Sequence, residues 1–391
     1  MSRRRAPPRR PPARATVRRA KPRRRAPATP DDAPPRGEFA LIDRLVRGLP
    51  TGSGVVVGPG DDAAVLRPRA GRDLVATTDA FVAGVHFVPE RLTAEEVGAR
   101  LAAANLSDLA AMAAEPRWAL LSLGLGDENA DWAVGVQRGL ARTLDAHGAA
   151  LAGGNVSRTR GATWLSLALL GEVERGRAWT RHGARPGDRL AVTGHPGRAG
   201  AAVRVGALSP PAFVAEACAP LRTAHAVPES RVAFARALAA AGGVTAAIDV
   251  SDGIAGDLAH LCEASGVGVA LDEDAWPDDP ALAVAARMLV FQQRHGRGWA
   301  GAARSWKSFR PAPSALAEAL RALRFGASDD YELLLAIDPA HVSASAVIAR
   351  QLGVALAFVG TCTDAPGVLV LHTRDGRPMP LPGAGWDHLA R

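Results

Sequence analysis

The feature that most constrains the fold of this chain is the alternation of short apolar runs with longer amphipathic stretches. A short apolar run is typical of a buried strand, whereas apolar residues at every third or fourth position are typical of a helix that buries one face. When the two kinds of segment alternate, an α/β fold is predicted. The predicted strands cover residues 55–57, 63–66, 74–78, 117–125, 163–173, 244–250, 331–337 and 354–361, and the predicted helices cover residues 37–49, 93–114, 129–148, 251–266 and 341–353.

A change in composition near Arg181 divides the chain. The chain has 391 residues, of which 48% are hydrophobic, so it can form one large or two medium domains. Residues 181–197 are rich in Gly, Pro and Arg, and the alternation resumes after them. We therefore expect an α/β domain at 37–180 and a second α/β domain at 181–391 with an insertion near 276–313. The part of this insertion from 292 to 313 is polar and Arg-rich, and it predicts an inserted segment or a long surface loop.

The first 36 residues have a different character from the rest of the chain. They hold 13 of the 47 Lys and Arg residues but only 2 of the 39 Asp and Glu residues, and they nearly lack large apolar side chains. Such a segment cannot bury enough surface to fold, so a disordered tail is predicted. The rest of the chain is slightly acidic, which argues against a nucleic-acid-binding fold, and contact of the tail with nucleic acid is not expected.

Cysteine usage and hydropathy exclude further classes of protein. Cys218, Cys262 and Cys362 are scattered and show neither the spacing of zinc ligands nor that of a disulfide framework. The sequence contains no apolar run long enough to span a bilayer. These observations predict a cytoplasmic protein that has no membrane partner.

Carboxylates recur where the apolar segments end. A single one of them could be a helix cap or a turn residue. Their repetition at strand ends, where α/β proteins bind ligands, indicates a shared site. Asp108 is the least easily explained, because it lies in the middle of an Ala- and Leu-rich helix. The set consists of Asp61 and Asp62 in "VVVGPGDDAAVL", Asp79 in "LVATTDAF", Asp108 in "NLSDLAAM", Asp249 and Asp252 in "AAIDVSDG", and Asp329 and Asp330 in "ASDDYEL".

The carboxylates and the scarcity of lysine together indicate a metal-dependent reaction. Lys21 and Lys307 are the only lysines, and the sequence contains no P-loop motif. Oxygen ligands suit Mg²⁺, which also keeps water molecules and accepts phosphate oxygens. We therefore arrive at the hypothesis of Mg²⁺-dependent phosphoryl transfer without a P-loop.

The order of the motifs resembles that of the thiamine-monophosphate kinases, in the aminoimidazole-ribonucleotide-synthetase superfamily. The resemblance extends from Gly37 to about Leu389, apart from the insertion, and rests on "GPGDDAAVL", "TTDAFVAGVHF", "NLSDLAAM", "GGN", "GRAWTRHGARPGD", "IDVSDGIAGDL" and "SDDYEL". It implies a two-domain synthetase-like α/β fold, with an N-terminal mixed-sheet domain that forms a homodimer. It also implies direct in-line transfer of a phosphoryl group from ATP to thiamine monophosphate, assisted by several Mg²⁺ ions and yielding thiamine diphosphate.

The resemblance also implies roles for individual residues. Mg²⁺ would be bound by Asp62, Thr77, Thr78, Asp79, Asp108, Asn155, Asp249 and Asp252. ATP would be bound by Gly154, Arg181 and Ser251, and the thiamine substrate by His86, Asp329 and Trp386. No side chain is expected to act as a nucleophile or a general base.

Two departures from the family pattern affect this interpretation. The family's "GGDTT" is "GGNVS" here, so Asn155 offers a neutral oxygen where the family has an acid. The family's "GGEDYEL" is "GASDDYEL", so Asp329 replaces a Glu, and Ala327 and Ser328 replace two glycines. Two alternatives therefore stay open. One is another ATP-using enzyme of the superfamily with a different small substrate, and the other is a nucleotide-binding paralogue with reduced activity.

Overall fold

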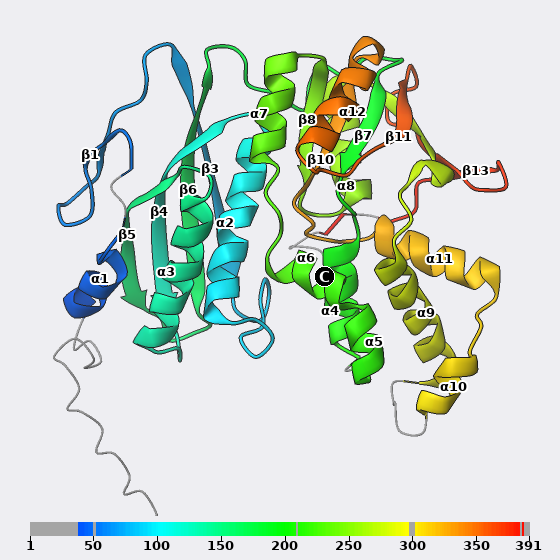
Figure 1. Ribbon diagram of the computed structural model, residues 1–391, viewed down its shortest axis with the longest axis horizontal. Coiled ribbons are helices and arrows are strands. Elements are labelled where there is room, and N and C mark those ends of the chain that lie inside the picture. Colours follow the sequence, from blue (N-terminus) through cyan, green and yellow to red (C-terminus); the bar gives the residue numbers. More distant parts are fainter. Residues whose placement is uncertain (1–37, 50–51, 209, 297–301, 384, 387–391) are drawn as a thin grey trace, which may run out of the picture.

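A computed structural model describes residues 38–49, 52–208, 210–296, 302–383 and 385–386 of the chain. The tail predicted for residues 1–36 therefore lies outside the described residues. Two large sheets organise the described part, a two-stranded sheet accompanies them, and helices lie between and around the large sheets (Figure 1). The N-terminal elements are α1 (Glu38–Val46), β1 (Val55–Val57), β2 (Val65–Leu66), β3 (Arg72–Val82), α2 (Ala94–Ala111), β4 (Glu115–Leu125), α3 (Ala130–Asp145), β5 (Ala150–Arg158) and β6 (Trp164–Glu174).

The N-terminal domain is a four-stranded mixed sheet with the strand order β3-β6-β4-β5. Strands β3 and β4 are antiparallel to β6, and β5 is parallel to β4. Helix α2 begins with the predicted capping box, in which Thr93 accepts from the backbone of Glu96 and Glu96 accepts from the backbone of Thr93. Helices α2 and α3 pack closely because Gly98 and Gly139 lie between them, where an added Cβ would come within about 2 Å of a backbone oxygen.

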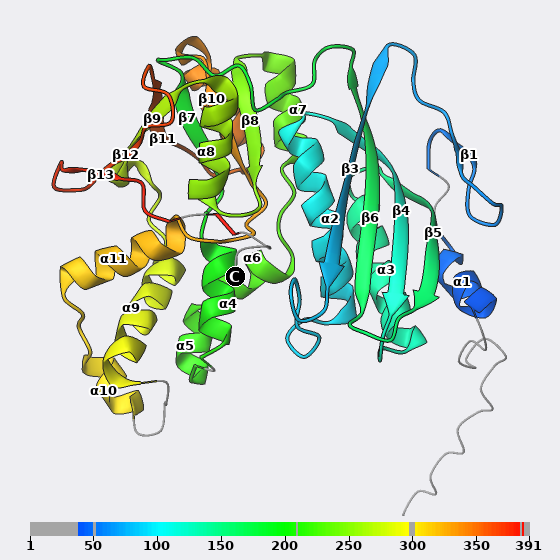
Figure 2. The same ribbon diagram turned by 180° about the vertical axis from the view of Figure 1, so that it is seen from behind.

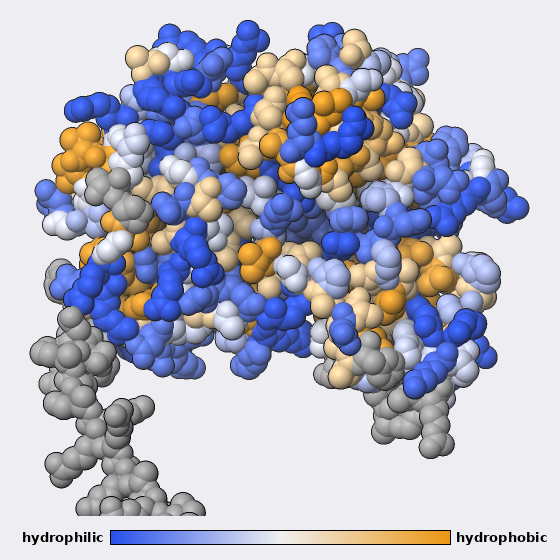
Figure 3. Space-filling view, viewed as in Figure 1, coloured by the Kyte–Doolittle hydropathy of each residue, from blue (hydrophilic) through white to orange (hydrophobic). Residues whose placement is uncertain are grey.

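One face of this sheet carries both helices, and the other carries none from the described part of the chain. Figure 1 shows α2 and α3 on the near face, whereas Figure 2, from behind, shows the bare strands. Strand β3 alternates accordingly, because Thr77, Asp79 and Phe81 face the helices while Leu74 and Thr78 are exposed on the bare face. The β1–β2 hairpin lies beside β5, and Figure 3 shows an apolar patch over it, where Val56 and Val65 are about half exposed.

The C-terminal domain is built on a seven-stranded sheet with the order β13-β12-β9-β11-β7-β10-β8. Helix α8 covers one face, while α7 and α12 pack on the other, together with α2 of the first domain. The two domains therefore share one apolar core across α2. The strands are β7 (Arg189–Thr193), β8 (Val244–Val250), β9 (Gly268–Asp272), β10 (Glu332–Ile337), β11 (Leu356–Thr363), β12 (Leu369–His372) and β13 (Pro378–Pro380), and the helices on the sheet are α7 (Val232–Ala241), α8 (Ile254–Ser265) and α12 (Val342–Gln351).

A separate helical layer extends from this sheet. Its core joins α4–α6 to α9–α11 through side chains such as Cys218, Leu221, Met288 and Phe291. The prediction of a long surface loop at 292–313 is wrong where α9 continues to His295 and where a further helix covers residues 302–308, whereas the prediction of an inserted segment stays a prediction. The helices of this layer are α4 (Arg198–Gly206), α5 (Ala212–Ala217), α6 (Ala219–Ala226), α9 (Pro280–His295), α10 (Ala302–Ser308) and α11 (Pro313–Arg324), and two 3-10 turns, η2 (Glu273–Ala275) and η3 (Pro339–His341), complete the list.

Every strand and helix predicted from the sequence has a counterpart in the structure, with small differences at the ends. The prediction missed β5, β7, β9, β12, β13, the helices from α4 to α7 and the helices from α9 to α11. In the described residues, no helix has both the length and the apolar character required to cross a membrane.

Candidate active site

Three of the predicted carboxylates converge between the two domains. Asp79 lies on β3, Asp108 near the C-terminal end of α2, and Asp249 near the end of β8. The Thr77 hydroxyl donates to Asp108, and the hydroxyl of Ser107 donates to Asp249 across 2.9 Å. Because β3 and α2 belong to the first domain and β8 to the second, the group forms only when the domains pack together.

The charges of this group are poorly compensated by the protein. Burial and then the nearby charge of Asp108 raise the pKa of Asp79 to about 7. Burial, followed by the same neighbour, raises the pKa of Asp249 well above its ordinary value. One oxygen of Asp79, Oδ2, is buried and accepts no hydrogen bond. Buried carboxylates are costly unless they are paired or bind a cation, so this group suits a ligand of positive charge.

The described residues contain no group of three or more His, Cys, Asp or Glu side chains already arranged around a metal position. The orphaned Asp79 oxygen and the mutual repulsion of the three acids nevertheless fit a divalent cation. Mg²⁺ also suits this arrangement because it needs few protein ligands and completes its shell with water and phosphate oxygens.

The segment that follows β8 is held in shape by Asp257 of α8. Its carboxylate accepts from the backbone N–H groups of Ser251, Asp252 and Gly253, at 3.1, 3.2 and 3.1 Å. Burial raises the pKa of Asp257 to about 7 in spite of these bonds. Asp257 therefore presents Ser251 and Asp252 beside Asp249, at the N-terminal end of α8. Burial raises the pKa of Asp108, and the hydrogen bond from Thr77 and then the nearby charge of Arg181 offset part of that rise, so Arg181 also lies close to the group.

A buried ion pair adjoins the carboxylate group. Arg100 of α2 is completely buried, and its guanidinium contacts the carboxylate of Asp329 and the backbone oxygen of His225. Burial opposes ionisation of Asp329, but Arg100 and then His225 outweigh it and hold the pKa below its usual range. Burial and then Arg100 lower the pKa of His225 to about 4, so this imidazole is neutral at neutral pH. Arg100 also lies over the ring of Tyr331, 5.5 Å from its centre.

The two adjacent acids of "SDDYEL" have different partners. Asp329 pairs with Arg100, while Asp330 accepts from the backbone N–H groups of Gly197 and Ala199 at 2.6 and 2.9 Å. Asp330 thus fixes the start of α4. The next residue, Tyr331, has a φ of 54°, a left-handed conformation that is uncommon for a residue other than glycine. With this local geometry, Asp329 faces Arg100 of the N-terminal domain, while Asp330 caps α4 of the C-terminal domain.

The remaining residues assigned to the substrate lie apart from each other. His86 follows β3, accepts at Nδ1 from the backbone of Val82 across 3.1 Å and stacks on Phe81. The side chain of Trp386 is exposed, and its backbone N–H donates to Asp252 across 3.0 Å. Trp386 therefore lies near the loop that follows β8, and His86 lies near the beginning of α2.

Several predicted ligands do not lie near this group. Asp62 is exposed on the β1–β2 hairpin, next to Asp61. Gly154 and Asn155 are exposed on β5, and the two strands β6 and β4 separate β5 from β3. At about 4.8 Å between neighbouring strands, β5 is roughly 14 Å from β3. The Thr78 side chain lies on the bare face, 3.3 Å from the hydroxyl of Ser166.

Sequence reasoning missed Arg100, His225, Asp257 and Tyr331. Arg100 offered a signal, because a lone Arg in the run "VGARLAAANL" stands among residues that must be buried. Asp257 offered none, since an acid in the first turn of a helix is ordinary. His225 and Tyr331 could not be assigned because their role depends on the contact between domains.

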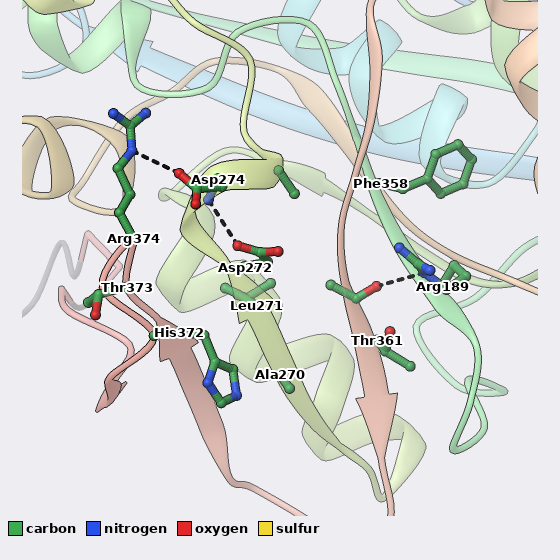
Figure 4. A pocket seen from close by; sticks show the side chains of 13 residues that line it. Arg189, Ala270, Leu271, Asp272, Asp274, Phe358, Thr361, His372, Thr373 and Arg374 are labelled. Atoms are coloured by element: carbon green, nitrogen blue, oxygen red, sulfur yellow. Dashed lines mark hydrogen bonds and ion pairs between the residues drawn. The ribbon is translucent and has the colours of Figure 1, made fainter.

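A second, polar groove lies away from this site, on the outer side of the C-terminal sheet. It encloses about 410 Å³ and is lined by Arg189, Asp272, Asp274 and Arg374 among others (Figure 4). Arg374 pairs with Asp274 at 3.1 Å, and Arg189 donates to the backbone oxygen of Gly360 at 3.3 Å. Asp272 accepts from the backbone N–H of Asp274 across 3.0 Å, so each of these charged groups has a partner in the protein, and the groove contains no predicted site residue.

Comparison with known proteins gives consistent matches over both domains. Residues 60–173 match the AIR synthase related protein, N-terminal domain, and residues 185–372 match the corresponding C-terminal domain. The chain is 35% identical over 364 residues to a thiamine-monophosphate kinase of Caulobacter vibrioides, covering 92% of this chain and 93% of that one. A crystal structure of thiamine-monophosphate kinase from Stenotrophomonas maltophilia matches with 32% identity and a TM-score of 0.67, covering 87% and 95% of the two chains. A structure of AaThiL complexed with AMPPCP and TMP matches at 24% identity with a TM-score of 0.65, covering 90% and 97%, and shows the shared fold.

Proposed function

We infer the chemistry of this site from the family to which the chain belongs, the thiamine-monophosphate kinases of the AIR synthase-related superfamily. The reaction is the ATP-dependent phosphorylation of thiamine monophosphate to thiamine diphosphate. The observation in this chain that supports it most directly is the convergence of Asp79, Asp108 and Asp249 between the domains. Such a group can hold the cations that phosphoryl transfer requires when no P-loop lysine is present.

Mg²⁺ is the proposed cofactor, with Asp79, Asp108 and Asp249 as its central ligands. Thr77 is hydrogen-bonded to Asp108, and Asp252 follows Asp249 on the loop that Asp257 shapes. When bound, Mg²⁺ would neutralise charge on the transferred phosphoryl group. The side chains of this chain orient both substrates and exclude water, and no protein nucleophile is needed for direct in-line transfer.

The two substrates are proposed to meet at the carboxylate group from different sides. Arg181 and the backbone around Ser251 would hold the phosphates of ATP, since Arg181 lies beside Asp108 and Ser251 adjoins Asp249. Asp329 carries a negative charge stabilised by Arg100, which suits the thiazolium cation of the acceptor. His86 and Trp386 would complete the acceptor site.

A homodimer is proposed through the bare face of the N-terminal sheet. The face presents small and apolar residues such as Leu74, Ala80, Ala168 and Leu170, which a monomer would leave in water. Asn155 lies on the edge strand of the same sheet, and Asp62 on the adjoining hairpin. These two residues therefore lie at the rim of the proposed interface. A role for them in metal or nucleotide binding would require the dimer.

The direct test of the reaction is incubation of the purified protein with ATP, MgCl₂ and thiamine monophosphate. We expect thiamine diphosphate and ADP in equal amounts, and no product when EDTA exceeds the metal. Product formed equally well in excess EDTA would contradict the metal-dependent mechanism, whereas ATP hydrolysis without phosphorylated thiamine would point to a different acceptor.

The dimer is tested by placing a charge at the centre of the bare face. Ala168 lies on β6 between Thr78 of β3 and Leu120 of β4. The change Ala168→Glu is expected to convert a dimer into a monomer by light scattering, because an interface does not tolerate an unpaired buried charge. The matched control is Ala344→Glu, at an exposed position of α12. A wild-type monomer, or a dimer that persists in Ala168→Glu, would contradict the proposal.

A further inference from the structure

The end of the described chain returns from the edge of the C-terminal sheet to the candidate active site. After β13, residues 381–383 and 385–386 run toward the loop that follows β8 (Figure 1). We call these residues the C-terminal segment. At its start, the N–H of Leu381 donates to a backbone oxygen of β12 across 3.1 Å. At its end, the N–H of Trp386 donates to the backbone oxygen of Asp252 across 3.0 Å.

Two glycines meet where the C-terminal segment crosses α8. A Cβ atom added to Gly256, in the first turn of α8, would lie 2.6 Å from Cα of Gly385. A Cβ atom added to Gly385 would lie 3.1 Å from Cα of Gly256 and 3.5 Å from Cβ of Asp252. Because non-bonded carbon atoms pack at about 3.5–4.0 Å, a side chain at Gly256 would displace the C-terminal segment from α8.

The loop after β8 is also contacted by the segment that leads to Asp329. A Cβ atom at Gly253 would lie 2.3 Å from the backbone oxygen of Gly326, and one at Gly383 would lie 2.5 Å from that of Phe325. The φ angles of Gly253 and Gly383 are 111° and 101°, which residues with a side chain rarely adopt. The loop after β8, the segment before Asp329 and the C-terminal segment therefore pack backbone against backbone.

We propose that the C-terminal segment fixes the conformation of the loop after β8 for cation binding, with Gly256 and Gly385 as positioning residues. The inference rests on the proposed function, in which Asp252 lies at the Mg²⁺ site, and deepens it by naming what positions that residue. Asp257 holds the loop from one side through the three N–H groups that donate to it. The C-terminal segment holds it from the other side through the backbone oxygen of Asp252.

The two glycines distinguish this proposal from an effect on α8 alone. Ala is a stronger helix former than Gly, so Gly256→Ala would stabilise α8 if the helix were isolated. If the contact with the C-terminal segment matters, the same change loosens the loop instead. Gly385→Ala lies on the other side of the contact and outside α8, so it should have the same effect on the loop.

The first test is amide hydrogen exchange in the full-length protein without metal. The reporting groups are the three backbone amides that donate to Asp257. We expect their exchange to be roughly tenfold faster in Gly256→Ala and in Gly385→Ala. The double variant should exchange no faster than the more affected single variant, because both changes disrupt one contact.

The control for this test is Ala264→Gly, at an exposed position near the end of α8. It changes the helix propensity of α8 far from the C-terminal segment, and the exchange of the same three amides should stay within about twofold of the wild type. Unchanged exchange in both Gly256→Ala and Gly385→Ala would overturn the proposal.

The second test connects the C-terminal segment with the cation. MgCl₂ should raise the melting temperature of the wild type relative to EDTA, and we expect Gly256→Ala to lose about half of that rise. The Mg²⁺ concentration for half-maximal formation of thiamine diphosphate should rise by about threefold in the same variant. If exchange is faster but MgCl₂ stabilises Gly256→Ala as much as the wild type, the segment does not position the cation site, and the proposal is wrong. If the wild type forms no thiamine diphosphate, the proposed function fails, whereas the exchange still decides whether the segment fixes the loop.

Discussion

Replacing Asp108 with asparagine is expected to slow phosphoryl transfer by roughly three powers of ten and to raise the melting temperature of the metal-free protein. Asparagine has nearly the same shape, so the fold is retained while one negative charge is lost. A cation that neutralises the transferred phosphoryl group is worth several kcal/mol in the transition state, and each 1.36 kcal/mol changes the rate tenfold.

The expected rise in the melting temperature of metal-free Asp108→Asn has the same origin as the loss of rate, the removal of one negative charge. Asp108 is half-buried, and its charge contributes to the raised pKa of both Asp79 and Asp249. Without a cation, the wild type holds these repelling carboxylates together, and removing one charge relieves the repulsion. With Mg²⁺ present the wild type is expected to melt at a higher temperature than Asp108→Asn, because it binds the ion more tightly and bound ligand stabilises the folded state.

The experiment compares melting temperatures of wild type and Asp108→Asn in EDTA and in MgCl₂, together with the rate of thiamine diphosphate formation. The control is Asp145→Asn, an exposed acid at the end of α3 that should change neither quantity. An Asp108→Asn protein with near-normal activity, or one that Mg²⁺ stabilises as strongly as the wild type, would show that Asp108 is not a central ligand.

The elements that carry the site were predictable from sequence because their signals are local. The capping box of Thr93 and Glu96 located the start of α2, and the apolar runs before Asp79 and Asp249 located β3 and β8. The sequence also marked Asp108 as exceptional, since a charge within an apolar helix needs a partner. The structure brings these three carboxylates together, with the predicted ligands Thr77 bonded to Asp108 and Asp252 on the loop after Asp249.

The environment of Asp329 could not be predicted, because it depends on contacts between distant segments. Arg100 and Asp329 are 229 residues apart, and only the packing of α2 against the C-terminal domain joins them. The same holds for a cavity of about 360 Å³ whose walls come from the β3–α2 connection and from α4–α6, because the sequence pattern did not reveal these helices. Short Ala-rich helices give a weak periodic signal.

The second large effect is expected at Arg100, whose replacement by methionine should lower the free energy of unfolding by about 3 kcal/mol. Removing one partner of a buried ion pair leaves the other charge without compensation, which typically costs about 3–5 kcal/mol, and the partial exposure of Asp329 reduces that cost. Methionine fills much of the same volume, so the loss reports the charge rather than a cavity. Arg138→Met is the matched control, because its pair with Glu95 at 3.0 Å is exposed and should contribute less than about 1 kcal/mol.

The double variant Arg100→Met/Asp329→Asn separates the ion pair from the rest of the packing. If the cost of Arg100→Met arises from the stranded carboxylate, neutralising Asp329 should restore at least half of the lost stability, measured by urea unfolding. Catalysis should not recover with stability, because the acceptor cation would then face an uncharged amide. If the change in unfolding free energy of the double variant equals the sum of the changes in Arg100→Met and Asp329→Asn, the two side chains are not coupled. A double variant that also regains the wild-type KM for thiamine monophosphate would remove Asp329 from the acceptor site.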